Sequence, residues 1–189
     1  MSHQDGLSQW SATVSTRLPQ LSGPQAAVLA LWSDGMVVAQ SCGITTVATF
    51  LGALVGQPAG TLRQRLRKWC DDAPDKRGDQ RRDLDVTTCF APLLSWVLAW
   101  WAPGERRLAL ALDASTRGQR VTVLAISVVY RGCAIPVAWR VVRATAKGAW
   151  RPHWEALLRD LDPASPSRSE PTGTRRSWLF MPPLRYHNK

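Results

Sequence analysis

The sequence predicts an α/β fold, in which a helical N-terminal region is followed by a three-stranded antiparallel meander and a further helix. Apolar residues recur with helical spacing through residues 24–71, alternate with a period of two from 108 to 142, and return to helical spacing from 149 to 161. The 189 residues are 45% hydrophobic and 20% charged. This composition supports a packed core and excludes a wholly disordered or fibrous chain.

Three helices are expected in the N-terminal region. The first begins at Pro24, because proline is tolerated in a first turn, and ends at Gly35. The second covers residues 44–55. A break rich in glycine and proline, 56–60, then separates it from a third helix over 61–70.

The third helix combines an apolar stripe with basic residues. Leu62, Leu66 and Trp69 recur at i, i+4 and i+7 and form the stripe. The remaining surface carries Arg63, Arg65, Arg67 and Lys68. Two helices joined by a glycine-containing turn, with the second helix basic, are typical of a helix-turn-helix that binds DNA. A basic face that is merely solvated is the alternative that these residues leave open.

The charge of the whole chain favours a polyanionic partner. There are 24 Lys and Arg against 14 Asp and Glu, a net charge of +10. Residues 1–60 hold one base and two acids, residues 61–82 hold eight and four, and residues 83–189 hold fifteen and eight. Positive charge therefore begins at Arg63, which makes the third helix the first candidate for phosphate contacts and DNA the expected partner.

A charged segment with proline and glycine, residues 73–82, predicts a linker between a first domain, 1–72, and a second, 83–161. The second domain is expected to open with a helix over 86–101, capped by Asp85 and apolar on nearly every side. Such a helix is buried in protein or in lipid. A membrane span takes about 20 apolar residues and this run is shorter, so we favour a core helix and no membrane.

Three strands are expected next, over residues 108–113, 120–130 and 134–142. They are apolar on both faces, which indicates a sheet covered on both sides. Pro136 cannot donate a hydrogen bond to a neighbouring strand and places the third strand at the sheet edge. A helix over 149–161 completes the pattern.

One carboxylate in this region stands out. Asp113 ends the first apolar strand and shares a face with Ala109 and Ala111. A charge in such surroundings needs a hydrogen-bond partner, a proton or a metal ion. The alternative is that Asp113 accepts hydrogen bonds from backbone N–H groups of the following turn. Position alone favours the turn role.

Five stretches of the sequence resemble the transposases of bacterial insertion sequences that carry a DDE catalytic triad: residues 41–50, 84–94, 108–115, 121–139 and 147–154. The resemblance implies an incomplete ribonuclease-H-like core, the three-stranded antiparallel meander plus helix, with Asp113 as the first metal-binding Asp. It also implies two divalent ions, usually Mg²⁺, which two Asp and one Glu hold for cleavage and joining of DNA at the ends of the element.

The remainder of the triad is not found. In the family, the second Asp lies on a fourth strand that pairs with the first strand, and the Glu lies on a later helix. Residues 162–189 are rich in proline and are expected to form a flexible tail. Asp160 and Asp162 are interpreted as surface acids, Glu170 lies in the proline-rich segment, and none of the three is assigned a role in the triad. We therefore expect a truncated transposase that does not cut or join DNA. The alternative is a DNA-binding module, or an inhibitor of an intact transposase. Without a fourth strand, the open edge of the first strand favours self-association.

The cysteines and the N-terminus bear on location. Cys42, Cys70, Cys89 and Cys133 form no C-x-x-C pair and are expected to be scattered buried thiols. Residues 1–6 lack the basic start and apolar run of a signal peptide, so a cytoplasmic location is expected.

Overall fold

The computed structural model describes residues 3–71, 84–101, 107–144, 150–162 and 177–181. The chain divides into two compact units, Met1–Asp85 and Val86–Lys189, here named the helical unit and the sheet unit. The linker expected over residues 73–82 lies outside the described residues.

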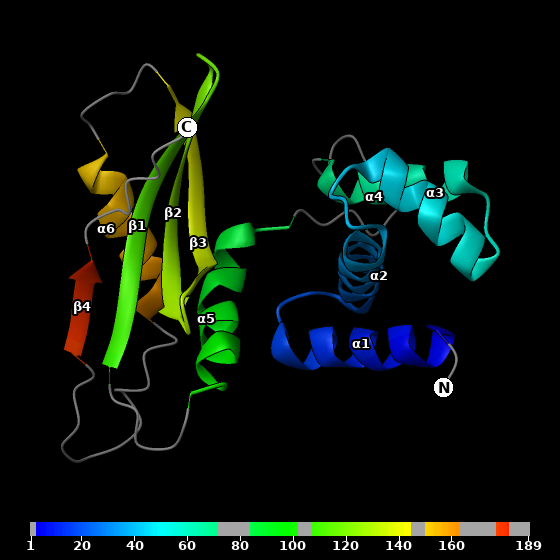
Figure 1. The fold of residues 1–189 in the computed structure, drawn as a ribbon, viewed down its shortest axis with the longest axis horizontal. Helices are drawn as coiled ribbons and strands as arrows, with labels where there is room; N and C mark the ends of the chain where they lie inside the picture. Colours follow the sequence, from blue (N-terminus) through cyan, green and yellow to red (C-terminus); the bar gives the residue numbers. More distant parts are fainter. Residues whose placement is uncertain (1–2, 72–83, 102–106, 145–149, 163–176, 182–189) are drawn as a thin grey trace. The chain divides into compact units, whose positions relative to one another are not determined.

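The described residues of the helical unit form the helices α1 (His3–Arg17), α2 (Gly23–Ala39), α3 (Ile44–Val55) and α4 (Ala59–Cys70) (Figure 1). The three helices expected from the sequence are present, and α1 is an addition to them. One cluster of buried side chains joins α2, α3 and α4: Val28, Leu31, Val47, Ala48, Leu51, Leu62 and Leu66. The helix α1 lies against α2, where the Trp10 indole donates a hydrogen bond to Ser33 Oγ at 2.8 Å.

The helix α2 does not end at Gly35 as predicted. It continues to Ala39 and closes at Gln40, whose backbone is left-handed with φ 49°. A Cβ atom on Gly35 would lie 2.7 Å from Cγ1 of Val47 and 2.8 Å from Cδ1 of Leu51. Glycine at this position therefore lets α3 approach α2 closely and does not terminate the helix.

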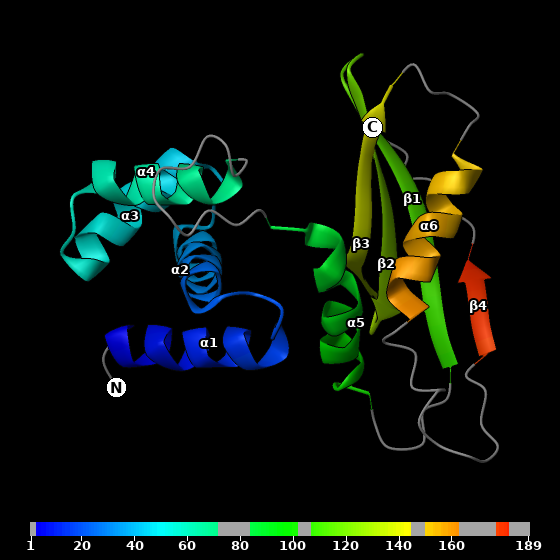
Figure 2. The ribbon, with the colours of Figure 1, turned by 180° about the vertical axis from the view of Figure 1, so that it is seen from behind.

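The sheet unit contains a four-stranded sheet in the order β3-β2-β1-β4 with helices against it (Figure 2). Its elements in chain order are a 3₁₀ turn η2 (Val86–Cys89), α5 (Phe90–Leu98), β1 (Arg107–Arg117), β2 (Val121–Tyr130), β3 (Cys133–Arg143), α6 (Arg151–Leu161) and β4 (Ser177–Met181). The first three strands are antiparallel neighbours, as predicted, and β4 runs parallel to β1. The coarse prediction of a mixed α/β fold is therefore confirmed.

The strand β4 was not expected, because it lies within the segment interpreted as a flexible tail. It occupies the edge of β1 that the sequence analysis left open, with Ser177 opposite Arg107 and Met181 opposite Ala111. The expectation of a wholly open edge is thus wrong. Residues 163–176 and 182–189 of the expected tail lie outside the described residues.

The strand β3 forms an edge of the sheet, as Pro136 predicted. Its pairing with β2 passes from Ala138 opposite Ile126 directly to Pro136 opposite Ser127. The one residue left over makes a β-bulge beside the proline, which cannot donate a hydrogen bond to the ladder.

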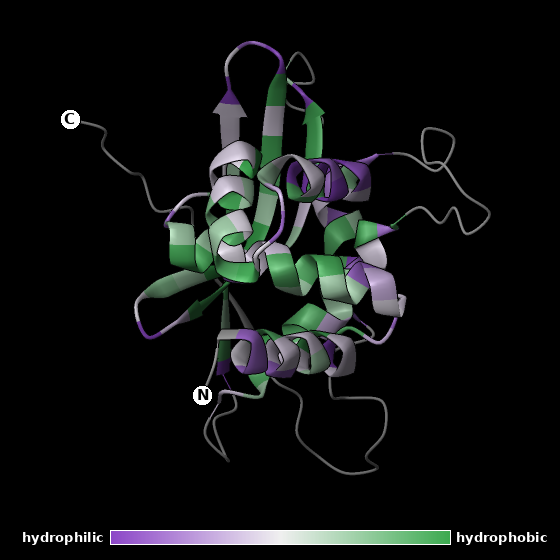
Figure 3. Ribbon diagram, turned by 90° about the vertical axis from the view of Figure 1, so that its right-hand side faces the viewer, coloured by the Kyte–Doolittle hydropathy of each residue, from purple (hydrophilic) through white to green (hydrophobic). Residues whose placement is uncertain are grey.

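The helices of the sheet unit cover one face of the sheet. Side chains of β1, β2 and β3 are buried on this face together with residues of α5 and α6. Figure 3 shows the ribbon coloured by hydropathy, with hydrophobic residues in green. The other face is more open, with Val141 59% exposed and Trp139 39% exposed, although the centroid of the Trp139 ring lies 5.1 Å from that of the Phe90 ring of α5. The prediction that both faces are covered is therefore wrong for the described part of this unit. The alternating sequence was apolar on both sides, but only one face acquired helices.

The helix expected over residues 86–101 is shorter than predicted. It begins as the turn η2, and α5 ends at Leu98. Only Phe90, Leu94 and Val97 are buried, and Trp100 is 53% exposed. Among the described residues no single helix is long and apolar enough to cross a membrane. The helices α2 and α3 reach that length only together, and they are bent by 93° at their junction.

Candidate functional site

The four basic residues predicted to contact DNA are all exposed on α4. Its apolar stripe is anchored in the helical unit, with Leu66 fully buried and the Trp69 indole donating a hydrogen bond to the Gln25 carbonyl oxygen at 3.3 Å. The Trp69 ring also meets the Trp32 ring edge to face, with 6.0 Å between centroids. These contacts fix the rotation of α4 about its axis. The opposite side, with its basic residues, must therefore face solvent.

Three of the four bases share one face of α4. They surround a shallow hollow of about 370 Å³ that is lined by Gly60, Arg63, Gln64, Arg67, Lys68 and Asp71. These positions recur every three or four residues, the spacing that places side chains on one side of a helix. Arg65 does not line the hollow: it is two residues from both Arg63 and Arg67, about 160° around the helix, although it is three residues from Lys68 at the margin of this side. We name the face made by Arg63, Arg67 and Lys68 the basic face.

The basic face holds three of the five Lys and Arg residues within residues 3–71. Within residues 3–71 only Arg17 and Arg65 are basic besides these three residues. No base of α4 forms an ion pair with another residue in the part of the chain that the structure describes. Such unpaired cations are available to neutralise phosphate groups. Gln64 and Asp71 also line this hollow and were not predicted, although each lies four residues after another lining residue, Gly60 and Arg67 respectively.

The turn between α3 and α4 is tight because it contains glycine. Gly56 caps α3 with φ 66°, in the left-handed region. A Cβ atom on Gly52, one turn earlier, would lie 2.9 Å from the backbone oxygen of Gln57. These glycines let two packed helices follow each other closely. The use of this helix pair as a helix-turn-helix stays a prediction.

Asp113 lies within β1 and not at its end. The strand continues to Arg117, and the residue opposite Asp113 on β2 is Ala125. The side chain is exposed and accepts a hydrogen bond from Ser115 Oγ at 2.6 Å. Both sequence interpretations are corrected here. Solvent reaches the carboxylate, so burial imposes no need for a counter-charge, and the turn begins only at Gly118.

The described residues do not fit the Mg²⁺ site that the resemblance implies. Nowhere among them do three His, Cys, Asp or Glu side chains gather closely enough to hold a metal ion. The sequence from 177 to 189, which includes β4, has no acidic residue. Two Mg²⁺ ions require several carboxylate ligands. Asp113 supplies one of the three that the family uses, and its role as a metal ligand stays a prediction.

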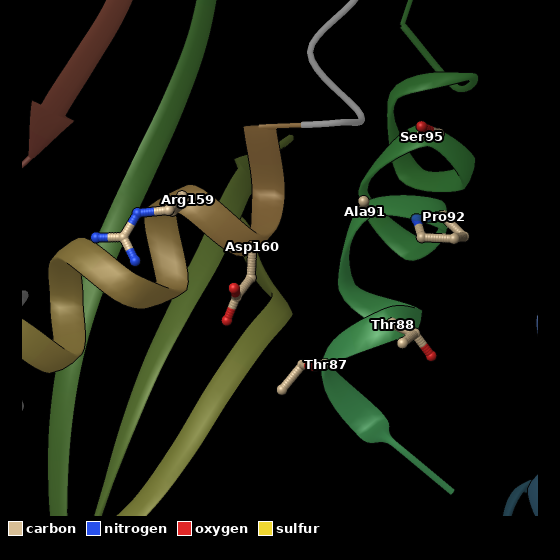
Figure 4. A pocket seen from close by; sticks show the side chains of 7 residues that line it. All are labelled: Thr87, Thr88, Ala91, Pro92, Ser95, Arg159 and Asp160. Atoms are coloured by element: carbon tan, nitrogen blue, oxygen red, sulfur yellow. The ribbon is translucent and has the colours of Figure 1, made fainter.

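A second hollow, of about 520 Å³, lies between the η2–α5 segment and α6, lined by Thr87, Thr88, Ala91, Pro92, Ser95, Arg159 and Asp160. Figure 4 shows Asp160 and Thr87 directed toward the gap between the helices and Arg159 directed away from it. The helix α6 packs on the covered face of the sheet, whereas Asp113 is on the open face. Asp160 therefore does not complete a site with Asp113.

The thiols are less buried than expected. Cys42, Cys70 and Cys133 are exposed and Cys89 is half-buried. The sequence interpretation of four buried thiols is therefore wrong.

Comparisons with protein-family models, with curated proteins and with solved structures found no match. The function must therefore be argued from the geometry of these residues and from the resemblance of the sequence.

Proposed function

We propose that this chain is a DNA-binding protein of the DDE transposase type that by itself neither cuts nor joins DNA. The basic face of α4 is the observation that carries the proposal. It presents Arg63, Arg67 and Lys68 to solvent from a helix that is anchored on its opposite side. Its DNA partner would be the ends of the mobile element. Since the DNA of such an element is bacterial, the cytoplasm is the compartment that we propose.

The order of the sheet supports the transposase part of the proposal. In the ribonuclease-H-like core that the resemblance implies, a fourth strand follows the helix and pairs with the first strand. Here β4 follows α6 and lies parallel to β1, on the side away from β2. Asp113 then occupies the strand that carries the first metal-binding Asp in the family.

The basic face has the dimensions and chemistry that duplex DNA requires. A helix of 12 residues such as α4 is about 18 Å long, and the major groove, about 12 Å wide, admits an α-helix. The three cations would contact phosphates and position the helix. Gln64 lies between them and has the amide that can bond bidentately to adenine, so it is the residue that we propose reads a base.

We propose that the chain does not cleave DNA because too few carboxylates gather among the described residues to hold two metal ions. A two-metal mechanism holds both ions between several carboxylates, so that one activates the nucleophile and the other stabilises the leaving oxygen. Among the described residues, Asp113 belongs to no group of three side chains that could hold a metal ion. We therefore propose no catalytic step for this chain alone.

DNA binding is tested with duplexes taken from both flanks of the coding sequence, beside a shuffled duplex of equal composition. Replacing Arg63, Arg67 and Lys68 together by Gln is expected to weaken binding about tenfold or more at low salt. The slope of log K against log salt concentration should become less steep by about 2.7, because each phosphate contact contributes about 0.9. Arg17→Gln, on α1, is the control. Equal binding by the triple variant and the control would contradict the proposal.

Cleavage is tested separately on supercoiled plasmid that carries the same flanking DNA, with Mg²⁺ or Mn²⁺. The plasmid is expected to stay supercoiled. Nicking by the wild-type protein that disappears in Asp113→Asn would overturn the non-cutting part of the proposal and leave the binding part intact.

A second candidate function is an inhibitor of an intact transposase, acting as a DNA-binding module without catalysis. The separate core of the helical unit favours it, because the buried residues of α4 pack in one cluster with those of α2 and α3 within that unit. In this case the wild-type chain should lower strand cleavage by a transposase that acts on the same ends. The triple Gln variant should not.

A further inference from the structure

Part of β1 has a neighbouring strand on one side only. Residues 112–117 pair with β2, but β4 stops opposite Ala111, and no other described strand lies along that side. We name residues 112–117 the free edge. Backbone N–H and C=O groups at such an edge are available to pair with another strand.

The free edge carries one acid and one base, which lie too far apart along the strand to form an ion pair with each other. Asp113 and Arg117 are both exposed and both lie on the open face of the sheet. Four residues of extended strand separate them, about 13 Å. Their neighbours across on β2 are Ala125 and Val121, which carry no charge. Neither charge therefore has an opposite charge beside it within the sheet.

We propose that the free edge pairs antiparallel with the same edge of a second copy of this chain. A two-fold axis perpendicular to the sheet keeps the helix-covered faces of both copies on one side, so residues of the same face oppose each other. If the axis passes at Ser115, Asp113 of each copy lies opposite Arg117 of the other. The pairing then contains two cross-strand ion pairs related by symmetry.

Neighbouring registers lack this charge match. An axis at Ala114 would place Asp113 opposite Ser115, and an axis at Thr116 would place it opposite Gln119, beyond the end of the strand. Charge complementarity therefore selects the register centred on Ser115.

This register is also sterically possible on the helix-covered face and along the free edge. Ala114 comes opposite Thr116, both small, and Leu112 comes opposite Gly118, where the turn of the second copy begins. Because β4 ends level with Ala111, it leaves the length of edge that the second copy needs. A short contact of this kind is weak, so self-association should depend on protein concentration.

The test exchanges the two charges in the full-length protein. Asp113→Arg places Arg opposite Arg, and Arg117→Asp places Asp opposite Asp, at two symmetric positions each. Either change is expected to raise the dimer dissociation constant, measured by sedimentation equilibrium, about tenfold. The double variant restores both ion pairs in the reverse sense and should restore the dimer.

Arg143→Asp is the matched control, since it makes the same charge change on an exposed residue at the end of β3, away from the free edge. Near-UV circular dichroism checks that each variant is folded. As a second measurement, amide hydrogen exchange of residues 112–117 in the wild type should slow as protein concentration rises.

Three results would overturn the proposal. One is a wild-type protein that is monomeric at all concentrations. This includes a monomer in which the amides of residues 112–117 are protected at every concentration, as they would be if residues 182–189 covered the edge. The others are single variants that dimerise like the wild type, and a double variant that does not recover. The assays contain no DNA, so their outcome is independent of the proposed function.

Discussion

The helical unit and the sheet unit present their charged residues in opposite ways. On α4, Arg67 follows Arg63 by four residues and Lys68 follows Gln64 by four, so the helical period brings all three cations to the lining of one hollow. On β1, Asp113 stands apart from other acids in its described contacts: the residue opposite it is Ala125 and its hydrogen-bond partner is Ser115.

This difference shows which kind of binding site one short segment can form and which kind needs several segments. A cluster of cations for phosphate contact needs one helix of 12 residues. A cluster of carboxylates for two metal ions, as the resemblance implies it, needs acids from two strands and a helix that only the folded chain brings together. β4 lies beside β1, but its residues, Ser177–Met181, include no acid. DNA binding can therefore be proposed for this chain, whereas strand cleavage cannot.

The largest expected effects come from shortening one buried side chain in the core of either unit. These variants test whether each unit can unfold while the other stays folded. Leu66 of the helical unit and Leu124 of the sheet unit are both 0% exposed. Replacing either by Ala removes methyl groups from a packed core and should lower the free energy of unfolding by about 2–5 kcal/mol. Hydrogen exchange, followed by peptide, measures the loss within each unit.

With Leu66→Ala, protection should fall in residues 44–71 and persist in residues 107–143. Val37→Ala is the control, because Val37 is 69% exposed and its truncation should change stability by no more than about 0.5 kcal/mol. Equal loss of protection in both units would show that they unfold together, and they could then not be treated as two independent regions.

A smaller effect is expected from the glycine at the contact of α2 with α3. Gly35→Ala gains about 1 kcal/mol of helix propensity, but its Cβ atom would lie within 3 Å of Val47 and Leu51. Both neighbours are fully buried and cannot move freely, so a net loss of about 1–2 kcal/mol is expected. Chemical denaturation measures it.

Gly6→Ala supplies the matched comparison within the same unit. Gly6 lies in α1, and a Cβ atom there would meet nothing within 4 Å. This variant should gain about 0.5–1 kcal/mol. If Gly35→Ala were stabilising to the same extent, the close approach of α2 and α3 would not be the reason for glycine at position 35.

Helices were predicted well where the apolar spacing and the residue that ends the helix can both be seen in the helix's own sequence. The bounds 44–55 match α3, because Gly56 stops the helix in the left-handed conformation. The apolar stripe of α4 was predicted because Leu62 and Leu66 follow the helical period. The helix α1 was missed, although Leu7, Trp10 and Val14 have the same spacing and could have indicated it.

The sheet was predicted less completely because its limits depend on distant pairing. Ser115 and Thr116 have the composition of a turn, yet they continue β1 because Val123 and Thr122 pair with them. The strand β4 has five residues in a polar, proline-rich segment, and only its pairing with β1 defines it. The position of Asp113 was therefore misjudged, while the residues of the basic face were identified correctly as exposed.

The smallest expected effect separates two arginines of α4. Arg67 lies on the basic face, and Arg65 lies outside its lining. Arg67→Gln should weaken binding to the flanking duplex a few-fold and reduce the salt slope by about 1, because one phosphate contact is lost. Arg65→Gln removes the same charge from the same helix and should change the affinity less than about twofold. Titrations at several salt concentrations measure both variants. Equal effects would show that DNA responds only to the total charge of α4, and the distinction between an oriented basic face and a merely charged helix would fail.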